Sequence, residues 1–217
     1  MVVQLLREWP PGYGGVERVA HDLACVWGGV VYSFDVQRQQ AAGKDPLPVN
    51  YPRRCLPSTK PLGRLRLPLP TRALWRLLRS PTPLHGHLPS PGVLLVLILA
   101  RLMRPSRRVT AHWHSFLVSD RGCTGTLFSA YQWLALQMMP LLSAVVTTSP
   151  LLAQELRFYG CARNRVFVLP CSLSQQQEQL GLAIPLPDAR AGEPLRVVFI
   201  GRLDSYKRLD WLLEALA

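Results

Sequence analysis

The stretch "PLHGHLPSPGVLLVLILARLMRPSRRVTAHWHS", residues 83–115, decides the fold, because it holds a strand, a helix and a second strand in direct succession. Residues 83–90 predict the end of a strand and a loop, and residues 107–115 predict a strand that leads into a loop. The segment 91–103 between them is apolar, but its uncharged run is far shorter than the roughly 20 residues that span a bilayer. We therefore interpret it as a buried helix.

Strands and helices alternate along the rest of the chain as well. Strands are predicted at residues 2–6, 28–34, 144–149, 164–170 and 197–201, and helices at 15–27, 71–80, 126–144 and 150–160, with an irregular Pro- and Arg-rich loop over 44–70. The strands are continuous apolar runs, which is typical of a parallel sheet covered on both faces. The sequence therefore predicts an α/β, Rossmann-like parallel sheet, whose ligands lie beyond the carboxyl ends of its strands.

The composition is that of a globular protein without a disulfide framework. Hydrophobic residues make up 48% of the 217 residues and charged residues only 18%, which argues against disorder throughout. The five cysteines are scattered and none forms a CxxC pair, so we expect neither disulfides nor a cysteine-based zinc site. No signal peptide is recognised at the start, and a reducing cytoplasm is the expected location.

The positive charge is concentrated in one segment. Residues 51–108 hold twelve Arg and Lys residues and no Asp or Glu, while the chain as a whole has a formal net charge of +12. We expect this segment to contact an anionic surface, either an acidic membrane leaflet or a phosphorylated acceptor. The alternative is a bias of composition, because 22 of the 25 basic residues are Arg.

Residues 71–80, "TRALWRLLRS", predict a basic amphipathic helix within that segment. Leu74, Trp75 and Leu78 are expected on one side, and Arg72, Arg76 and Arg79 on the other. Such a helix can lie in a membrane interface, in which case Arg72, Trp75, Arg76 and Arg79 would make the contact. Alternatively the apolar side packs on the sheet and the arginines are solvated. Both interpretations stay open at this point.

Two glycines stand directly before the first predicted helix, in "PPGYGGVER" at residues 10–18. The backbone of Gly14 and Gly15 can approach a ligand closely, and the N–H groups at a helix start favour an anion such as phosphate. Glu17 falls in the first turn, where the helix dipole stabilises a carboxylate. A tight turn without a ligand fits the same residues equally well.

The end of the chain repeats the strand, glycine and helix order in "VVFIGRLDSYKRLD". Arg202 and Lys207 are five residues apart and span the loop and helix start after the predicted strand, so both can point at one anionic group. Two solvated surface cations are the alternative interpretation.

Four of the five histidines occur in two pairs, His85 and His87 in "HGH" and His112 and His114 in "HWH". Residues two apart on a strand face the same way, so two such pairs could form a zinc site. The sequence offers no nearby Asp or Glu to complete it, and we expect no metal. We instead expect one or two histidines to hydrogen-bond a polar substrate, and His112 is alternatively a core histidine with a satisfied ring nitrogen.

Together these motifs resemble family 4 glycosyltransferases, the retaining enzymes of the GT-B fold. "PPGYGGVERVAHDLA" is similar to the family's opening glycine loop and first helix, and "LHGHLPSP" with "VTAHWHSF" to its paired histidine segments. "TTSPLLAQELRFYGCARNRVFVLP" resembles the end of the first domain, and "VVFIGRLDSYKRLDWLLEAL" the start of the second. The order and spacing of these motifs cover nearly the whole chain.

The resemblance implies a role for each matching residue. His114 corresponds to the catalytic histidine near the reacting sugar, and His87 belongs to the acceptor side. Gly14 and Gly15, together with Arg202 and Lys207, correspond to the residues that bind the diphosphate of a nucleotide-sugar donor. The cations would stabilise the leaving nucleotide. No DxD motif is present, so we expect no metal and no cofactor besides the nucleotide-sugar substrate.

The implied organisation is an N-terminal acceptor-side domain over residues 1–175, a linker over 176–194 and the start of a donor-binding domain over 195–217. The family's E-x7-E segment is expected beyond residue 217, so we expect this chain to be a fragment without activity of its own.

The implied function is sugar transfer to a glycan or lipid-linked acceptor in cell-envelope or exopolysaccharide assembly, in the cytoplasm or on the inner face of the plasma membrane. The alternative is a non-catalytic membrane-docking or scaffold module that works with a separate donor-binding chain. A role in nucleic-acid binding is not expected. The sequence does not define the donor sugar, the acceptor, the linkage or the oligomeric state.

Overall fold

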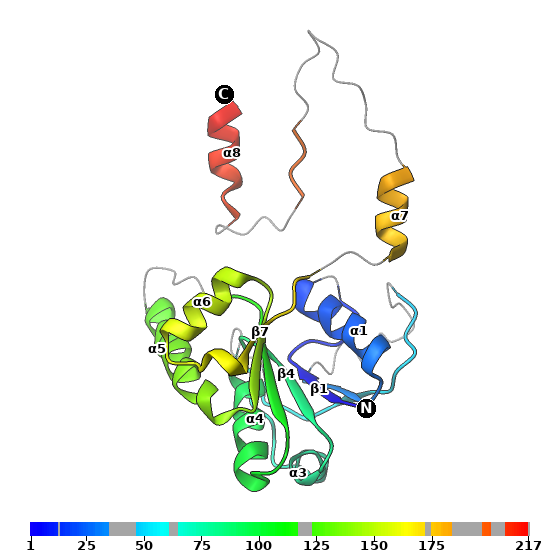
Figure 1. Ribbon diagram of the computed structural model, residues 1–217, viewed down its shortest axis with the longest axis vertical. Coiled ribbons are helices and arrows are strands. Elements are labelled where there is room, and N and C mark those ends of the chain that lie inside the picture. The colour runs from blue at the N-terminus through cyan, green and yellow to red at the C-terminus, as the bar shows by residue number, and fades with distance from the viewer. Residues whose placement is uncertain are drawn as a thin grey trace. The chain divides into compact units, whose positions relative to one another are not determined.

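The computed structural model describes residues 1–12, 14–34, 47–60, 65–116, 123–171, 175–183, 197–200 and 207–216. The chain forms two compact units, Met1–Cys171 and Ser172–Ala217, and each is described by itself. The first unit contains the sheet and both predicted histidine motifs (Figure 1).

A single parallel sheet forms the centre of the first unit. Within the described residues it has seven strands in the order β3-β2-β1-β4-β5-β6-β7, and every neighbouring pair is parallel. The strands are β1 (Val3–Leu6), β2 (Val31–Ser33), β3 (Arg53–Cys55), β4 (Leu84–Leu88), β5 (Val109–Trp113), β6 (Ala144–Thr147) and β7 (Val166–Val168). This confirms the predicted Rossmann-like parallel sheet.

The strand β3 lies in the Pro- and Arg-rich segment that the sequence predicted to be irregular, and that prediction was wrong. Its neighbour β2 holds it through backbone hydrogen bonds, from Val31 N to Pro52 O at 3.0 Å and from Leu56 N to Ser33 O at 2.7 Å. Proline is tolerated beside a short edge strand because one side of the strand needs no ladder donors. A three-residue strand between prolines gives no apolar run for sequence reasoning to detect.

Helices cover both faces of the sheet, as predicted. Strand order runs one way from β1 to β3 and the other way from β4 to β7, so right-handed crossovers place the two sets of helices on opposite faces. Figure 1 shows α1 on one side of the strands and α4 and α5 on the other. These helices span Gly15–Trp27 (α1), Arg72–Arg79 (α3), Pro91–Met103 (α4), Cys123–Met138 (α5) and Pro150–Phe158 (α6).

The larger apolar core lies between the sheet and helices α3 to α6, and the smaller one lies under α1. The middle residue of the "HGH" motif is a glycine because α4 packs closely against this position of β4. A Cβ at Gly86 would lie 2.7 Å from Cδ1 of Leu97 on α4, too close for any real contact. Alternation along β4 therefore turns Gly86 toward α4 and sends His85 and His87 to the other face.

The helix starts follow from local chemistry. Ser149 Oγ accepts a hydrogen bond from Leu152 N at 3.2 Å, and Pro150 occupies the first position of α6, as the sequence predicted. The long helix predicted over 126–144 instead ends at Met138 and continues as a 3-10 turn, η1 (Met139–Leu141). Pro140 explains the change, because proline has no N–H for the α-helical ladder. A second 3-10 turn, η2 (Arg163–Arg165), precedes β7.

The described part of the second unit contains two helices, α7 (Gln175–Ala183) and α8 (Leu209–Leu216). The sequence predicted a linker where α7 lies, but its Gln, Glu and Leu residues are strong helix formers. The sequence also predicted a buried strand over 197–201. Residues 197–200 are not a strand, and Val198 and Ile200 are 78% and 92% exposed. Among the residues described for this unit there is no second strand to pair with.

Across the described residues, no helix has both the length and the apolar character needed to cross a bilayer.

Candidate active site at the carboxyl ends of the central strands

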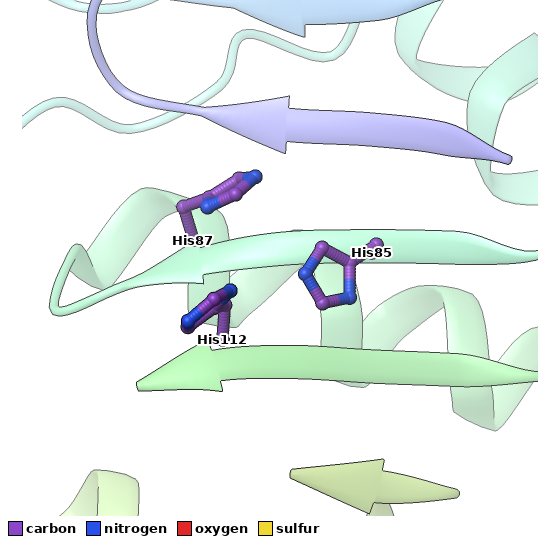
Figure 2. Close-up of side chains that lie close together, drawn as sticks. All are labelled: His85, His87 and His112. Atoms are coloured by element: carbon purple, nitrogen blue, oxygen red, sulfur yellow. The ribbon is translucent and has the colours of Figure 1, made fainter. Parts of the chain in front are cut away.

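A row of polar side chains crosses the centre of the sheet on the face away from the larger core. Strand pairing sets Gln4 beside His85, His85 beside Thr110, and His87 beside His112. Figure 2 shows His85 and His87 on β4 and His112 on β5 projecting from the same face. This is where strand order reverses between β1 and β4, the position at which such sheets bind ligands.

A chain of hydrogen bonds links Gln4, His87 and His114. His87 Nε2 lies 2.9 Å from Gln4 Oε1, and His87 Nδ1 lies 3.0 Å from His114 Nε2. An amide oxygen can only accept, so Nε2–H of His87 donates to Gln4, and Nδ1 of His87 accepts from Nε2–H of His114. Nδ1 of His114 then keeps a lone pair. The structure thus brings together two predicted site residues, His87 and His114, and adds Gln4.

The sequence analysis missed Gln4 and Thr110, although a signal for each was present. Both are polar residues inside otherwise apolar strands, in "VVQLL" and "VTAHW". Gln4 is fully buried, and Thr110 Oγ1 lies 2.8 Å from His85 Nδ1. Most buried polar side chains in core strands have hydrogen-bond partners, so polar residues inside apolar strands indicate a polar row.

All four histidines are neutral at ordinary pH. Burial lowers the pKa of His85 to about 3, with His112 adding to the effect, and lowers the pKa of His112 to about 4. Burial, followed by the neighbouring His112 and His85, lowers the pKa of His114 to about 2. The pKa of His87 also lies well below its ordinary value, mainly through burial. Neutral imidazole both donates and accepts a hydrogen bond, which suits a sugar hydroxyl.

The position of His112 matches the sequence-based expectation only in part. It is fully buried inside β5, whereas His114 is half-buried just beyond the strand end. Its ring stacks on that of His114, with centroids 4.1 Å apart and planes 8° apart. The expected satisfied ring nitrogen is not found, since neither nitrogen of His112 has a hydrogen-bond partner among the described residues.

The glycine loop has the predicted relation to its helix. Gly14 is the N-cap and Gly15 the first residue of α1, with Glu17 in the first turn. A side chain at Gly14 would collide with the Glu17 carboxylate, while a Cβ at Gly15 would meet nothing within 4 Å. Arg53 of β3 holds the preceding loop, through a hydrogen bond to Pro10 O at 2.6 Å and by lying over the Trp9 ring at 4.9 Å.

The predicted cation pair cannot be placed as a pair. Arg202 lies outside the described residues, and Lys207 is exposed in the second unit. Next to it, Arg208 has a φ of 51°, pairs with Asp210 at 2.8 Å and lies over the Trp211 ring at 3.8 Å. The joint role of Arg202 and Lys207 stays a prediction.

The structure of α3 corrects the predicted placement of Trp75 beside Leu74 and Leu78 on one side of the helix. Leu74 and Leu78, with Leu77, are buried in the larger core, so they are not available to a membrane. Trp75 is 46% exposed and lies on the arginine side, with the guanidinium of Arg79 5.5 Å from its ring. An exposed hollow is lined by Arg72, Trp75, Arg76, Arg79 and Ser80.

Comparisons with known proteins identify the family and the fold of the chain. The model of Glycosyltransferase Family 4 matches residues 13–176. Solved structures of Anabaena Alr3699/HepE are similar in fold. The complex with UDP and glucose has a TM-score of 0.60 at 17% identity, over 100% of this chain and 57% of that chain. The complex with UDP has a TM-score of 0.51 at 14% identity, over 84% of this chain and 50% of that chain.

A third structure, Alr3699/HepE in complex with UDP-glucose, has a TM-score of 0.51 at 17% identity, over 84% of this chain and 50% of that chain. This chain therefore spans little more than half the length of these proteins. No sequence among the curated proteins matches it.

Proposed function

The chain belongs to glycosyltransferase family 4, and from this premise we propose that it provides the acceptor side of a retaining transferase that uses a nucleotide-sugar donor. The observation that carries the proposal is the hydrogen-bonded chain from Gln4 through His87 to His114 at the carboxyl end of the sheet. The Alr3699/HepE structures contain UDP or UDP-glucose, which supports a nucleotide-sugar as the donor class.

His114 is proposed to meet the substrate, and His87 to position it. With Nε2–H committed to His87, His114 presents the lone pair of Nδ1, which can accept a hydrogen bond from a sugar hydroxyl. The hydrogen bond from His114 to His87 fixes the tautomer and the ring orientation of His114, which is how a positioning residue supports a catalytic group. Because His114 is neutral, it orients the substrate without adding a positive charge beside the reacting carbon.

The glycine loop is proposed to bind the donor diphosphate. The backbone at Gly14 and Gly15 allows close approach, and the start of α1 favours an anion. Arg202 and Lys207 would hold the diphosphate and stabilise the charge of the leaving nucleotide. These roles need no metal, in line with the absence of a DxD motif from the sequence.

The acceptor is proposed to be a glycan or lipid-linked sugar at the cytoplasmic face of a membrane. The exposed side of α3, with Arg72, Trp75, Arg76 and Arg79, is suited to anionic headgroups. The same patch favours a second candidate function, a non-catalytic docking module that acts with a separate donor-binding chain. In that case His114 would not be needed for transfer.

The test compares two proteins, the 217-residue chain and the same chain followed by a donor-binding domain that carries E-x7-E. Each is incubated with a panel of nucleotide sugars and an extract of acceptor lipids. We expect transfer only from the longer protein. There, His114→Ala should abolish transfer while circular dichroism stays unchanged, and Gly15→Ala should weaken donor use. An active His114→Ala variant would favour the docking module, and transfer by the 217-residue chain alone would refute the division of labour.

A further inference from the structure

Three buried imidazoles converge below His114. His85, His87 and His112 each place one ring nitrogen so that all three lie within 4.8 Å of one another (Figure 2). Their exposed fractions are 2%, 2% and 0%. In a tetrahedral site with Zn–N bonds of 2.0–2.1 Å, the ligand nitrogens are about 3.4 Å apart. Modest rotations of the three rings would bring their nitrogens from the observed separations to this distance.

The hydrogen bonds around His85 leave a lone pair directed at the cluster. Thr110 Oγ1 lies 2.8 Å from His85 Nδ1 and 3.5 Å from Leu84 O. In the Nδ1–H tautomer of His85, which the proposal requires, the hydroxyl oxygen accepts from the ring and its hydrogen can reach Leu84 O. The lone pair of His85 is then on Nε2, which has no hydrogen-bond partner within the described part of the chain. A hydrogen bond that fixes the tautomer from behind is the usual support of a metal-binding histidine.

The ring of His112 is also available for binding. Both of its nitrogens are buried without a partner among the described residues, and one of them carries a lone pair in either tautomer. A buried nitrogen without a partner is unfavourable, and a bound ligand would recover that cost. Two of the three rings thus have unused bonding capacity in the same place.

From this arrangement we propose that His85, His87 and His112 bind one divalent transition-metal ion of the Zn²⁺ class. A set of three neutral imidazoles suits Zn²⁺, Cu²⁺, Ni²⁺ or Co²⁺, whereas Mg²⁺ and Ca²⁺ require oxygen ligands. In the described ranges no carboxylate joins the cluster, so the ion keeps its charge and has an open position for a further ligand. The metal site shares His87 with the hydrogen-bonded chain of the proposed function, but metal binding is measured without sugar transfer and does not rest on that function.

The ion and His114 compete for the same nitrogen. Nδ1 of His87 accepts from His114, while Nε2–H of His87 is committed to Gln4, so coordination by His87 replaces the bond from His114. Since His114 stacks over His112 and is half-buried, its release also opens a route to the cluster. Removing the His114 ring should therefore leave metal affinity unchanged or raise it, although His114 is the fourth histidine of the group.

The test titrates the 217-residue chain with Co²⁺ by visible absorption, followed by displacement with Zn²⁺. A Cys25→Ser background removes the one Cys–His contact in the described structure, Cys25 Sγ to His21 Nε2 at 3.7 Å. We expect one equivalent of Co²⁺ with a ligand-field spectrum and no thiolate charge-transfer band. His85→Phe and His112→Phe should each lower the affinity at least about 100-fold, and Thr110→Val about tenfold.

The matched control is His114→Phe, which removes a histidine of the same motif as His112 but no proposed ligand. If a Phe variant fails to fold, NMR of the unsubstituted chain bound to Co²⁺ gives the number of ligands directly. Imidazole resonances shifted by Co²⁺ are then counted, and three shifted rings are expected. The proposal is overturned if Co²⁺ and Zn²⁺ do not bind. It also fails if binding survives the loss of His85 and His112, or if His114→Phe weakens binding as much as His112→Phe does.

Discussion

The two ends of the central strands β4 and β5 are both polar and buried, yet they are built differently. At the amino end, Arg107 is 3% exposed and donates to backbone carbonyls, from Nε to Thr82 O at 2.7 Å and from Nη1 to Leu77 O at 2.8 Å, while its Nη2 has no partner in the described structure. Within the strands, His112 near the carboxyl end of β5 and His85 near the start of β4 keep ring nitrogens without partners in the described structure. Donors that bond to backbone carbonyls hold a fold together, whereas an imidazole nitrogen with a lone pair can bind a ligand.

The amino end explains part of the positive charge. Arg101 donates to Leu141 O at 3.0 Å and Arg104 to Arg79 O at 2.6 Å, which fastens helix and turn ends to one another. A cation beside C-terminal helix carbonyls is favourable because it opposes the helix dipole. Burial, and to a lesser degree Arg104, lowers the pKa of Arg107 to about 10, so its guanidinium stays charged at neutral pH. Some of the arginines that make residues 51–108 basic therefore stabilise the fold and are not available to a ligand.

The largest expected effect is acid destabilisation through the carboxyl end. The pKa values of His85, His87, His112 and His114 lie below 6.5 in the folded chain, so the unfolded chain binds more protons below that pH. Stability should fall with pH from about 6.5 downward, by about 1.4 kcal/mol per pH unit for each histidine. At about pH 5.5 the four together cost about 5–6 kcal/mol, comparable to the whole stability of a small domain.

Urea unfolding between about pH 7.5 and about pH 5.5, with a chelator present, measures this loss. His112→Phe is the matched variant, because it removes one titrating ring and fills the same space with a neutral one. Over this range its stability should decline by about 1.4 kcal/mol less than that of the unsubstituted chain. A flat stability over this range in the unsubstituted chain would mean that the histidines are not held neutral, and the comparison of the two ends would lose its basis.

The second effect tests the amino end. Arg107→Met keeps much of the side-chain volume but removes the donors to Thr82 O and Leu77 O. Thr82 O then loses the Arg107 donor and Leu77 O keeps only the bond from Ser80 N at 3.3 Å, which should lower the free energy of unfolding by about 3 kcal/mol. The adjacent Arg108 is exposed, and Arg108→Met should change stability by less than about 0.5 kcal/mol. Equal losses in the two variants would show that Arg107 acts only through general charge.

The sequence predicted the elements that local residue patterns determine, and it missed those whose structure depends on pairing or packing with distant segments. The apolar runs gave the parallel sheet, and Ser149 with Pro150 gave the start of α6. The strand β3 was missed because its pairing with β2 decides its structure, and residues 197–200 were assigned to a strand although no described strand of their unit pairs with them. Helical spacing alone could not tell which of Leu74, Trp75 and Leu78 would meet the sheet.

The candidate site shows the same division. The "HGH" and "HWH" motifs pointed to His87 and His114 as site residues, and His114 lies nearer the carboxyl end of β5 than His112 does. The motifs could not reveal that Gln4, 83 residues away, fixes the tautomer of His87, or that a third ring joins His85 and His87. Such contacts arise from strand order, which brings β1 between β2 and β4.

A smaller effect is expected from Gln4→Met, which tests the hydrogen-bonded chain itself. Loss of the buried bond to His87 should lower the free energy of unfolding by about 1 kcal/mol. It should also free Nε2 of His87, so that the tautomers of His87 and His114 are no longer fixed. Long-range ¹⁵N–¹H spectra of the imidazole rings measure this directly. Ser33, also buried on this face in the neighbouring strand β2, provides the control Ser33→Ala, which should leave both tautomers unchanged.

The smallest effect concerns the exposed side of α3, where arginines face solvent instead of buried carbonyls. Because Leu74 and Leu78 are buried, only Trp75 and the exposed Arg72, Arg76 and Arg79 can meet a membrane. Each Arg near an anionic surface contributes about 1 kcal/mol, and the attraction fades within about a Debye length. We expect co-sedimentation with vesicles that contain phosphatidylglycerol, weakened by salt and by Gln at the three Arg positions. Trp75→Ala should also reduce binding, whereas Trp133→Ala, which removes a 62% exposed tryptophan of α5, should not. If the chain stays in the supernatant at low salt, or if both tryptophan variants lose binding equally, α3 is not the contact surface.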